Sequence, residues 1–525
     1  MSIFLGIDVG TSGTKTIAIN ATGKVLAEAT QCYPSHHPRP LWSEQNPDDW
    51  WQATVLSVQS VISQCGCKAD EVKAIGLSGQ MHGAVFLDAA NQVIRPAILW
   101  NDQRTTAECD EIEDRAGGRQ KLLKMVANPA LTGFTAPKIL WLRKNEPRHY
   151  ERMRKLLLPK DDVRRRMTGE FATDVSDAGG MLLLDVGKRT WCKELLSALD
   201  LDISILPQLF ESPEITGKLT KEAAATLGLT TDCAVVAGAG DCPANAVGTG
   251  VVAGGSLATS IGTSSVMMVH SDEYKYDPEA RLQTMCHAVP GKWFMMGVNL
   301  SGGGCLQWFR NQLCQKEHAE FTDGDFYDLL SQEAKKIPPG SDGLMFLPYL
   351  SGERTPHNDA DARACFIGLT MFHGRSHMVR AIMEGVAYNM KDSLALIRAL
   401  DIPVDEIRAS GGGSSSAVWR QIQADVFGQA VYTINCSQGP AYGVALLAAV
   451  GAHEFATVEE ACAATIKVEQ KTSVTTSGAR YYQAGFPIFQ ELYHVLKGQF
   501  KKLACLEKNE RTPEQLAQMG SNADY

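Results

Sequence analysis

Two copies of one short pattern constrain the fold of this chain more than any other feature. Residues 4–19, FLGIDVGTSGTKTIAI, read as two apolar strands separated by glycines and hydroxyl side chains. Residues 256–269, SLATSIGTSSVMMV, repeat that plan. An ordinary hairpin needs only two turn residues, so the longer Gly-Thr-Ser tips indicate a second purpose. One copy in each half of 525 residues indicates an internal duplication and at least two domains.

Composition narrows the function classes. Hydrophobic residues make up 44% and charged residues 21% of the chain, as in ordinary globular proteins. The net charge of −9 argues against a nucleic-acid surface and does not favour an anionic membrane. No apolar run approaches the roughly 20 residues of a membrane helix, and we recognise no secretory signal. Any anionic ligand must therefore be held by local backbone dipoles.

The fourteen cysteines are scattered singly, and the closest pair is Cys65 and Cys67. No C-x-x-C spacing occurs, so neither a zinc cage nor a redox motif is predicted. Isolated cysteines behave as small buried hydrophobic residues in a reducing compartment. We therefore expect free thiols and a cytoplasmic location.

The order of elements predicts a mixed sheet with helices. Three short strands precede a helix that begins after Asn46, with Pro47 at its first position, and a further strand follows. The charge-rich stretch at about 105–230 is expected to be a helical insertion on that sheet. Later helices are expected at about 376–400 and, from small buried residues, at 441–452.

Domain limits follow from these patterns. We expect an N-terminal domain over 1–250 and a C-terminal domain over 251–505. The last residues, 506–525, are polar and without periodicity, so they are expected to be a disordered tail.

Glycine-rich loops, rather than the common nucleotide motifs, are the candidates for phosphate binding. Neither G-K-[ST] nor G-x-G-x-x-G occurs in the chain. Backbone amides at glycine-rich turns can hold phosphate oxygens, and glycine lets the phosphate approach closely. Such loops follow predicted strands at four places: 10–13, 238–240, 262–264 and 411–413. The alternative for a single loop is a hairpin with a polar tip.

Two aspartates accompany these loops. Asp8 cannot contact a phosphate directly, because two anions repel each other. It can act on the phosphate if Mg²⁺, or the water shell of that ion, lies between them. Asp241 ends the apolar run CAVVAGAGD, at the edge where open α/β sheets bind ligands. There it could accept the proton of a hydroxyl group that attacks phosphorus. The alternative for Asp241 is a helix N-cap, because Pro243 follows.

A second set of residues is suited to a polyol. Met81 and His82 follow a predicted strand, and Trp100, Asn101 and Asp102 follow another. Together they supply an apolar wall and fixed hydrogen-bonding groups, although a lone histidine is more often structural. Gly411, Gly412 and Gly413 precede a helix capped by a serine and could form a flat floor for an adenine ring. A tight strand–helix turn explains these glycines equally well.

Together these stretches resemble the FGGY carbohydrate kinases. The resemblance rests on GIDVGTSGTK, AGAGD, IGTSS and SGGGSSSAVWRQIQADV, and on residues 364–384, which fit the second signature of the family. It covers about residues 3 to 500 and excludes the tail. LWSEQNPDDWW, GLSGQMHGA, RPAILWNDQR and LPYLSGERTPH are similar to members that act on a ketopentose.

The resemblance implies an α/β fold of two domains, actin-like and ribonuclease H-like, with a catalytic cleft between the domains. It implies transfer of phosphate from ATP, with Mg²⁺, to the terminal hydroxyl of a ketopentose. Asp241 would be the catalytic proton acceptor, Met81 and His82 would line the sugar site, and Asp8 would serve the metal. The implied ATP-binding set is Gly10, Thr11, Ser12, Lys15, Gly262, Thr263, Gly303, Gln307, Gly412, Gly413 and Ser414.

Two departures from the family pattern bear on specificity. Cys242 follows Asp241 where relatives often carry an amide side chain, which concerns sugar preference. Ala417 stands where some relatives carry asparagine, which concerns nucleotide affinity.

Other functions stay open. The acceptor could be another ketopentose or polyol, such as ribulose. An actin-like or Hsp70-like ATPase would share both tips without needing a sugar pocket. A catalytically inactive sugar sensor is disfavoured because both aspartates are present. The expected partners are a small sugar and ATP, with no nucleic acid and no membrane, and a homodimer is left open.

Overall fold

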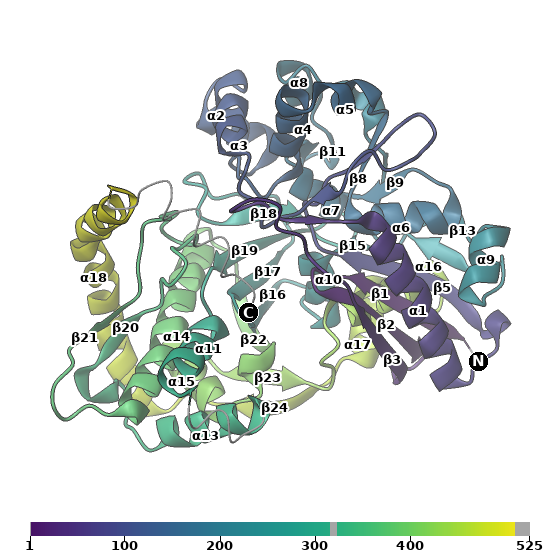
Figure 1. Cartoon of the computed structure of the whole chain (residues 1–525). Helices are drawn as coiled ribbons and strands as arrows, with labels where there is room; N and C mark the ends of the chain where they lie inside the picture. Colours follow the sequence, from purple (N-terminus) through teal and green to yellow (C-terminus); the bar gives the residue numbers. More distant parts are fainter. Residues whose placement is uncertain (1, 316–322, 510–525) are drawn as a thin grey trace. The chain divides into compact units, whose positions relative to one another are not determined.

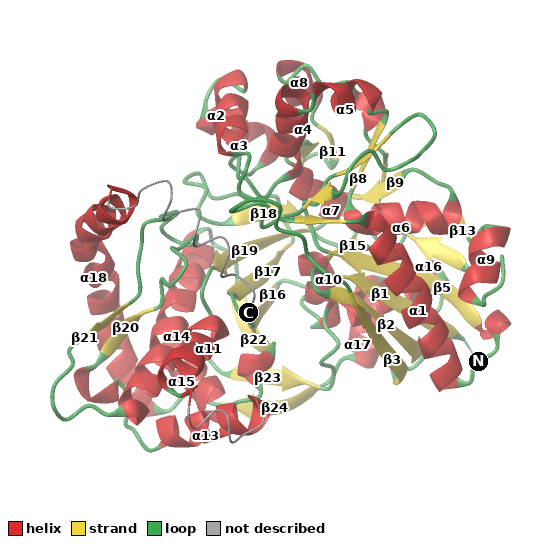
Figure 2. Cartoon of the chain, in the orientation of Figure 1, coloured by secondary structure: helices red, strands yellow, loops and turns green. Residues whose placement is uncertain are grey.

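Strands and helices alternate through both halves of the chain in the computed structural model, which describes residues 2–315 and 323–509 (Figures 1 and 2). The strands are β1 (Ile3–Val9), β2 (Gly13–Asn20), β3 (Val25–Cys32), β4 (Glu44–Gln45), β5 (Val72–Gly79), β6 (Val85–Leu87), β7 (Ala97–Ile98), β8 (Lys155–Leu157), β9 (Ala172–Asp174), β10 (Leu184–Asp185), β11 (Thr190–Trp191), β12 (Gln208–Phe210), β13 (Ile215–Lys218), β14 (Ala234–Val236), β15 (Ala239–Gly240), β16 (Gly255–Ile261), β17 (Ser265–Ser271), β18 (Gln283–Cys286), β19 (Trp293–Asn299), β20 (Met345–Leu347), β21 (Cys365–Ile367), β22 (Val404–Ser410), β23 (Val431–Ile434) and β24 (Val468–Thr472). The helices are α1 (Pro47–Cys65), α2 (Thr106–Arg115), α3 (Arg119–Val126), α4 (Thr135–Asn145), α5 (Pro147–Arg152), α6 (Pro159–Thr168), α7 (Val175–Ala178), α8 (Lys193–Ala198), α9 (Lys221–Leu227), α10 (Asp241–Gly248), α11 (Gly303–Leu313), α13 (Asp323–Lys335), α14 (Arg375–Ala399), α15 (Ala417–Phe427), α16 (Pro440–Gly451), α17 (Val458–Thr465) and α18 (Thr476–Asn509).

The two long sheets repeat one topology. In the first, with the order β13-β14-β5-β1-β2-β3, β1 runs parallel to β5, β5 runs parallel to β14, and β14 is antiparallel to β13. In the second, with the order β18-β19-β17-β16-β22-β23-β24, the same relations link β16, β22, β23 and β24. Each repeat begins with a hairpin that carries a Gly-Thr-Ser tip. This confirms the duplication expected from the sequence.

Successive side chains of β1 point to opposite faces of the first sheet, so its apolar residues pack on both faces. Leu5 and Ile7 pack with Trp50 and Val58 of α1, which lies against β2 and β3 (Figure 1). Asn46 caps α1 by accepting the N–H of Asp48 at 3.2 Å, as the sequence predicts. Phe4 points to the opposite face, toward α16.

Two glycines allow α16 to lie directly on the sheet. Gly6 and Gly76 are register neighbours on β1 and β5. A Cβ atom on Gly6 would lie 1.9 Å from the carbonyl oxygen of Ala441, and one on Gly76 would lie 2.0 Å from that of Val444. Residues 441–451 of α16 are all buried, which confirms the buried helix expected from its small side chains.

The chain divides into two compact units that are discontinuous in sequence. The first comprises Met1–Gly254, Val269–Met295 and Asn435–Lys467, and the second Gly255–Met268, Met296–Ile434 and Val468–Tyr525. Sequence alone places α16 after the boundary near residue 250, but the close packing at Gly6 and Gly76 includes it in the first unit. The tail expected at 506–525 begins as helix, since α18 continues to Asn509, and residues 510–525 lie outside the described residues.

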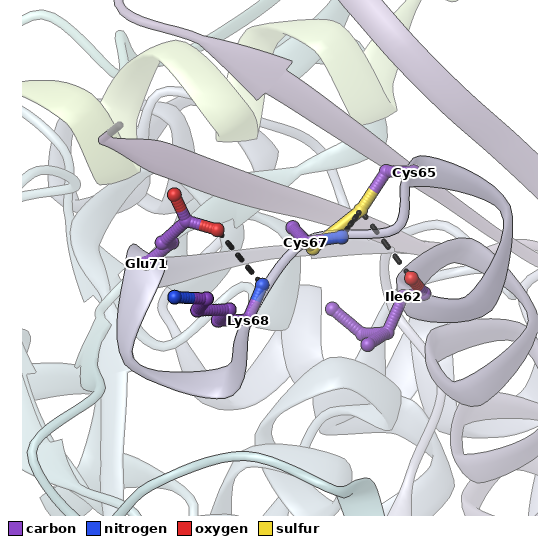
Figure 3. The surroundings of a disulfide bond; sticks show 5 residues. All are labelled: Ile62, Cys65, Cys67, Lys68 and Glu71. Carbon is purple, nitrogen blue, oxygen red and sulfur yellow. Dashed lines mark hydrogen bonds between the residues drawn. A yellow bond between two sulfur atoms is a disulfide. The ribbon is translucent and has the colours of Figure 1, made fainter.

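The end of α1 differs from the sequence expectation. Gly66 closes the helix in the left-handed conformation, with φ 62°, and Cys65 and Cys67 are joined by a disulfide (Figure 3). The expectation that all thiols are free is wrong for this pair, because the turn at Gly66 brings the two side chains together. The other twelve cysteines form no disulfide.

No helix within the described ranges has both the length and the apolar character needed to cross a membrane.

Candidate active site

The first Gly-Thr-Ser tip, residues 10–12 between β1 and β2, has its carbonyl groups bound by the protein. Tyr33 Oη donates to the carbonyl of Gly10 at 2.5 Å, and the N–H of Tyr33 donates to that of Ser12 at 3.4 Å. Gln45 Nε2 donates to the carbonyl of Thr11 at 2.7 Å. Within residues 2–315 and 323–509, the N–H groups of Thr11 and Ser12 donate no hydrogen bond, which suits an anionic ligand.

Gln45 belongs to a hydrogen-bond network that the sequence analysis did not predict. Its Oε1 atom accepts hydrogen bonds from Trp50 Nε1 at 3.0 Å and from Gln80 Nε2 at 2.8 Å. Gln45 is fully buried, so its Nε2 is held toward Thr11. The network brings together three distant segments, and no local pattern in the sequence marks it.

Asp8 and Asp241 lie at the same edge of the first sheet. Val9 and Gly240 both stand opposite Gly79, on strands that run parallel to β5. Asp8 therefore lies one residue before this level and Asp241 one residue beyond it. Asp241 begins α10, and the N-cap position is occupied by Gly240 rather than by Asp241.

Burial perturbs both carboxyl groups. It raises the pKa of Asp8 to about 7, and the charge of Asp241 adds to the rise. Burial also raises the pKa of Asp241 to about 6, although the N–H of Cys242, which donates to Oδ1 at 2.7 Å, opposes the rise. A carboxyl group with a pKa near 6 is suited to accept a proton at neutral pH.

Asp8 is suited to be the carboxylate that the protein provides to a magnesium site. Its Oδ1 atom is buried and has no hydrogen-bond partner among the described residues. Those residues contain no cluster of three or more His, Cys, Asp or Glu side chains that could hold a metal. Mg²⁺ retains several waters and needs only one or two carboxylates beside substrate phosphates.

Met81 and His82 are held in place by glycines. A Cβ atom on Gly240 would lie 2.7 Å from Met81 Cγ, and one on Gly180 would lie 2.6 Å from His82 Nδ1. His82 adopts φ 70°, which is unusual for a residue with a side chain, and its Nδ1 lies 2.8 Å from the carbonyl oxygen of Gly180. Its ring meets that of Phe134 edge-on at 4.8 Å. Met81 thus lies beside Gly240, the neighbour of Asp241, and His82 lies beside Gly180, which Met81 also approaches.

The carbonyl of His82 is also fixed. Thr135 Oγ1 donates to it at 3.0 Å and Lys138 Nζ donates to it at 2.8 Å. Burial lowers the pKa of Lys138 to about 7. These two residues of α4 hold the loop that carries His82, so the helical insertion supports this part of the site.

Trp100 and Asn101 differ from Asp102 in accessibility. Trp100 is 41% exposed and its Nε1 donates to Thr11 Oγ1 at 3.0 Å, so it stands beside the first tip. Asn101 is exposed. Asp102 is fully buried, where the sequence predicts a direct sugar contact. Only the first two are therefore accessible to a ligand in this arrangement.

The oxygens of Asp102 are engaged inside the protein. Arg104 donates to Oδ1 through Nε at 2.9 Å and to Oδ2 through Nη2 at 2.7 Å, and the N–H of Ser43 donates to Oδ2 at 2.6 Å. The guanidinium of Arg104 lies 3.6 Å from the ring centroid of Trp42 and 4.8 Å from that of Trp141. Asp102 thus anchors a stacked arginine under the 99–104 loop.

Lys15 forms an ion pair within the protein. Its Nζ lies 3.0 Å from Glu28 Oε2, and both side chains are accessible to solvent. Lys15 stands opposite Asp8 in the β1–β2 register, and its charge slightly lowers the pKa of that residue. It therefore belongs to the neighbourhood of the first tip, with its ammonium group paired.

The second tip, residues 262–264 in the second unit, also has carbonyl groups bound by the protein, here by backbone N–H groups alone. The N–H groups of Gly302 and Gly304 donate to the carbonyl of Thr263 at 2.8 and 3.0 Å. The N–H of Gly303 donates to the carbonyl of Gly262 at 2.7 Å. A Cβ atom on any of these three glycines would lie within 2.8 Å of the tip backbone, so α11 can begin here only with glycine.

The three glycines before α15 differ in their surroundings. Gly411 adopts φ 73°, and Gly413 lies against Ile261, whose Cβ would be 2.6 Å from an added Cβ atom. Gly412, by contrast, faces open space, since an added Cβ there would meet nothing within 4 Å. Ser414 Oγ donates to the carbonyl of Gly411 at 2.7 Å. Gly412 is therefore the one of these three glycines with open space beside it, where the sequence predicts an adenine floor.

Ser416 is the serine that caps α15, accepting the N–H of Trp419 at 3.2 Å. Ala417 follows as the first residue of that helix and is exposed. Gln307 is exposed on α11, one turn after Gly303.

Comparison with known proteins covers both units. Residues 3–248 match the N-terminal domain of the FGGY family of carbohydrate kinases, and residues 257–452 match its C-terminal domain. The xylulose kinase of Escherichia coli strain K12 is 41% identical over 495 residues, which cover 94% of this chain and 99% of that protein. The xylulose kinase of Bacillus subtilis strain 168 is 37% identical over 509 residues, covering 97% and 100%.

A solved structure is similar along the same length. The structure described as a xyloylose kinase from Brucella ovis gives a TM-score of 0.87 at 34% identity, and it covers 95% of this chain and 100% of that one.

Proposed function

The chain belongs to the FGGY family of carbohydrate kinases, and we propose that within this family it phosphorylates D-xylulose. Its fold is the two-domain α/β, actin-like fold of the FGGY sugar kinases. The proposed reaction converts ATP and D-xylulose to ADP and D-xylulose 5-phosphate. Identity of 37–41% with two xylulose kinases along nearly the whole chain supports this choice of sugar.

The position and the pKa of Asp241 are the observation that carries the proposal. Asp241 stands at a sheet edge, next to the glycine on which Met81 packs, and its pKa of about 6 leaves it mostly ionised at neutral pH. We assign it as the proton acceptor. As the terminal hydroxyl oxygen of the sugar bonds to the γ-phosphorus, its proton passes to the Asp241 carboxylate. The bond from that phosphorus to the ADP oxygen breaks, and ADP leaves with the electron pair.

The sugar side of the site is assigned to neighbours of Asp241. Met81 supplies an apolar contact, and His82 and Asn101 supply hydrogen bonds to hydroxyl groups. Trp100 supplies a wall beside the first tip. Asp102 supports this wall through Arg104 rather than by contact, because its oxygens are already engaged.

Both tips are assigned to phosphate groups. The carbonyls of each tip are held by the protein, so the N–H groups of Thr11, Ser12 and Thr263 are oriented for anionic oxygens. Gly412 gives an open floor that suits a planar base. We assign Gly303 to fixing the second tip, since its N–H is already bound to Gly262.

Asp8 is assigned to the metal. Its Oδ1, which is buried and has no hydrogen-bond partner in the described part of the chain, would hold Mg²⁺ through water. When bound, this ion supplies charge that offsets the negative phosphates in the transition state.

An ADP-release assay with a sugar panel tests the proposal. The panel contains D-xylulose, ribulose, hexuloses and polyols, together with a control without sugar. We expect D-xylulose to give the highest kcat/KM and the control to give a rate far below it. A higher kcat/KM for ribulose would instead make the chain a kinase of that pentulose. ADP release that is independent of sugar would favour an actin-like or Hsp70-like ATPase.

Location and assembly also belong to this proposal. A cytoplasmic location is consistent with the use of ATP and with twelve cysteines that form no disulfide. A homodimer stays a prediction, which light scattering after size-exclusion chromatography measures.

A further inference from the structure

Glu353 is a buried carboxylate that the proposed reaction does not use. It is 1% exposed and lies in the loop after β20. Its Oε1 atom accepts the N–H of Leu300 and the N–H of Arg354, each at 2.8 Å. Its Oε2 atom accepts a hydrogen bond from Nδ2 of Asn389, on α14. The side chain therefore links three separate segments of the second unit.

The residues beside Glu353 bind the same strand end. Thr355 donates its N–H to the carbonyl of Val298 at 3.0 Å, and its Oγ1 accepts the N–H of Val298 at 3.1 Å. Asn299 Nδ2 donates to the carbonyl of Thr355 at 2.8 Å. Residues 353–355 are thus joined by hydrogen bonds to each of residues 298–300, where β19 ends.

The fixed strand end leads directly into the glycine turn. Leu300 is followed by Ser301 and then by Gly302–Gly304, whose N–H groups bind the second tip. Only Ser301 lies between Leu300 and the first of these glycines. A shift at Leu300 would therefore move the N–H groups that hold the carbonyls of Gly262 and Thr263.

The chemistry of Glu353 favours a positional role over simple packing. Burial raises its pKa to about 7, so the ionised form is costly at this position. An apolar side chain of similar size would avoid that cost, but it would leave the N–H of Leu300 without its acceptor. The carboxylate thus provides the acceptor for the N–H of Leu300, which lies just before the glycine turn.

We propose that Glu353 is a positioning residue for nucleotide binding, because it fixes Leu300 and through it the Gly302–Gly304 turn that orients the second tip. This inference rests on the proposed function, in which that tip binds the phosphates of ATP. It predicts that loss of the acceptor at residue 353 weakens ATP binding and leaves sugar binding unchanged.

Three substitutions separate the acceptor from burial and size. Glu353→Met preserves the length of the side chain without an acceptor, and Glu353→Asp preserves the charge but shortens the reach to Leu300. Glu353→Gln retains an oxygen for Leu300. Its new Nε2 can donate to Asn389 Oδ1, which has no partner in the described protein, after a half-turn of that amide.

Asp392 provides a matched control in the same unit. It lies on α14, is 4% exposed, and burial raises its pKa to about 7. It accepts a hydrogen bond from Gln490 Nε2 at 2.7 Å, on α18, rather than from the strand end. Asp392→Asn therefore reproduces the loss of a buried carboxylate without changing the contacts of Leu300.

Steady-state kinetics and titration calorimetry with ATP test the proposal on the full chain. We expect Glu353→Met and Glu353→Asp to raise the KM and Kd for ATP at least about tenfold, with the KM for sugar within twofold of the unmodified protein. Glu353→Gln and Asp392→Asn should stay within threefold for ATP. If Glu353→Met does not fold, the comparison of Asp with Gln gives the answer.

Two results would overturn the proposal: unchanged ATP affinity in a folded Glu353→Met or Glu353→Asp protein, or equal losses in the Glu353→Asp and Asp392→Asn proteins. Failure of the proposed function looks different. A chain that binds ATP but phosphorylates no sugar would refute that function, and the ATP titrations would still decide the role of Glu353. A chain that binds no ATP would refute both.

Discussion

Replacing Asp241 with asparagine tests the assigned proton acceptor with little structural change. Asparagine has nearly the same shape, and its Oδ1 can still accept the N–H of Cys242, which donates to Asp241 at 2.7 Å. The start of α10 should therefore remain intact. What the substitution removes is the ability to take up a proton.

The magnitude follows from the role and from the pKa. General-base catalysis contributes about 10²–10⁴-fold, so kcat should fall by that factor, which corresponds to roughly 3–5 kcal/mol of barrier. A pKa raised to about 6 means that the carboxyl group becomes ionised, and thus able to accept a proton, as pH rises through 6. In the unmodified protein kcat/KM for the sugar should therefore be half-maximal near pH 6. It should fall about tenfold for each pH unit well below that value.

A coupled ADP-release assay over pH 5 to 8 measures both effects, and calorimetry with ATP provides the control. We expect the Asp241→Asn protein to bind ATP with unchanged affinity, to turn over at least about 10²-fold more slowly, and to lose the step near pH 6. Turnover within threefold of the unmodified protein would refute the assignment. A step retained near pH 6 would refute it too, whereas a step near pH 7 would report the carboxyl group of Asp8, whose pKa is raised to about 7.

Three further substitutions test the remaining assignments. Asp8→Asn should raise the Mg²⁺ concentration needed for half-maximal rate at least about fivefold, since the buried Oδ1 loses its charge; an unchanged metal titration would contradict this role. His82→Ala should raise the KM for the sugar about tenfold, as expected for one lost hydrogen bond, with the KM for ATP within twofold in initial-rate kinetics. Gly412→Ala should raise the KM for ATP without lowering Tm, because the added methyl group meets no protein atom. Gly374→Ala, which also faces open space, is its control, and equal kinetics for the two proteins would exclude a nucleotide floor at Gly412.

Features carried by contiguous residues could be predicted from the sequence. The cap at Asn46, the buried α16 and the helix over Arg375–Ala399 follow from local composition and periodicity, and the structure confirms them. The repeated hairpins follow from two similar stretches, and the order of strands in both sheets confirms the duplication. The family follows from the combined motifs, and both domain matches confirm it.

The availability of each side chain at the site could not be predicted in this way. Asp102 is a suitable residue type for a sugar contact, but Arg104 and the backbone of Ser43 occupy its oxygens. Lys15 has a suitable charge for phosphate, but Glu28 pairs with it. Such pairings depend on which neighbours the fold supplies, and neighbours from other strands or loops leave no local pattern.

The sequence by itself therefore determined the repeated plan of two strand–tip–strand hairpins, most helix positions and the family. Only the tertiary structure decided that α16 packs in the first unit, that Cys65 and Cys67 join, and that the carbonyls of both tips are bound from within. The physical reason is the range of the interactions involved. Helix caps, periodicity and turn glycines act over a few residues, whereas the environment of Asp8, Asp241 and Glu353 is set by residues tens to hundreds of positions away.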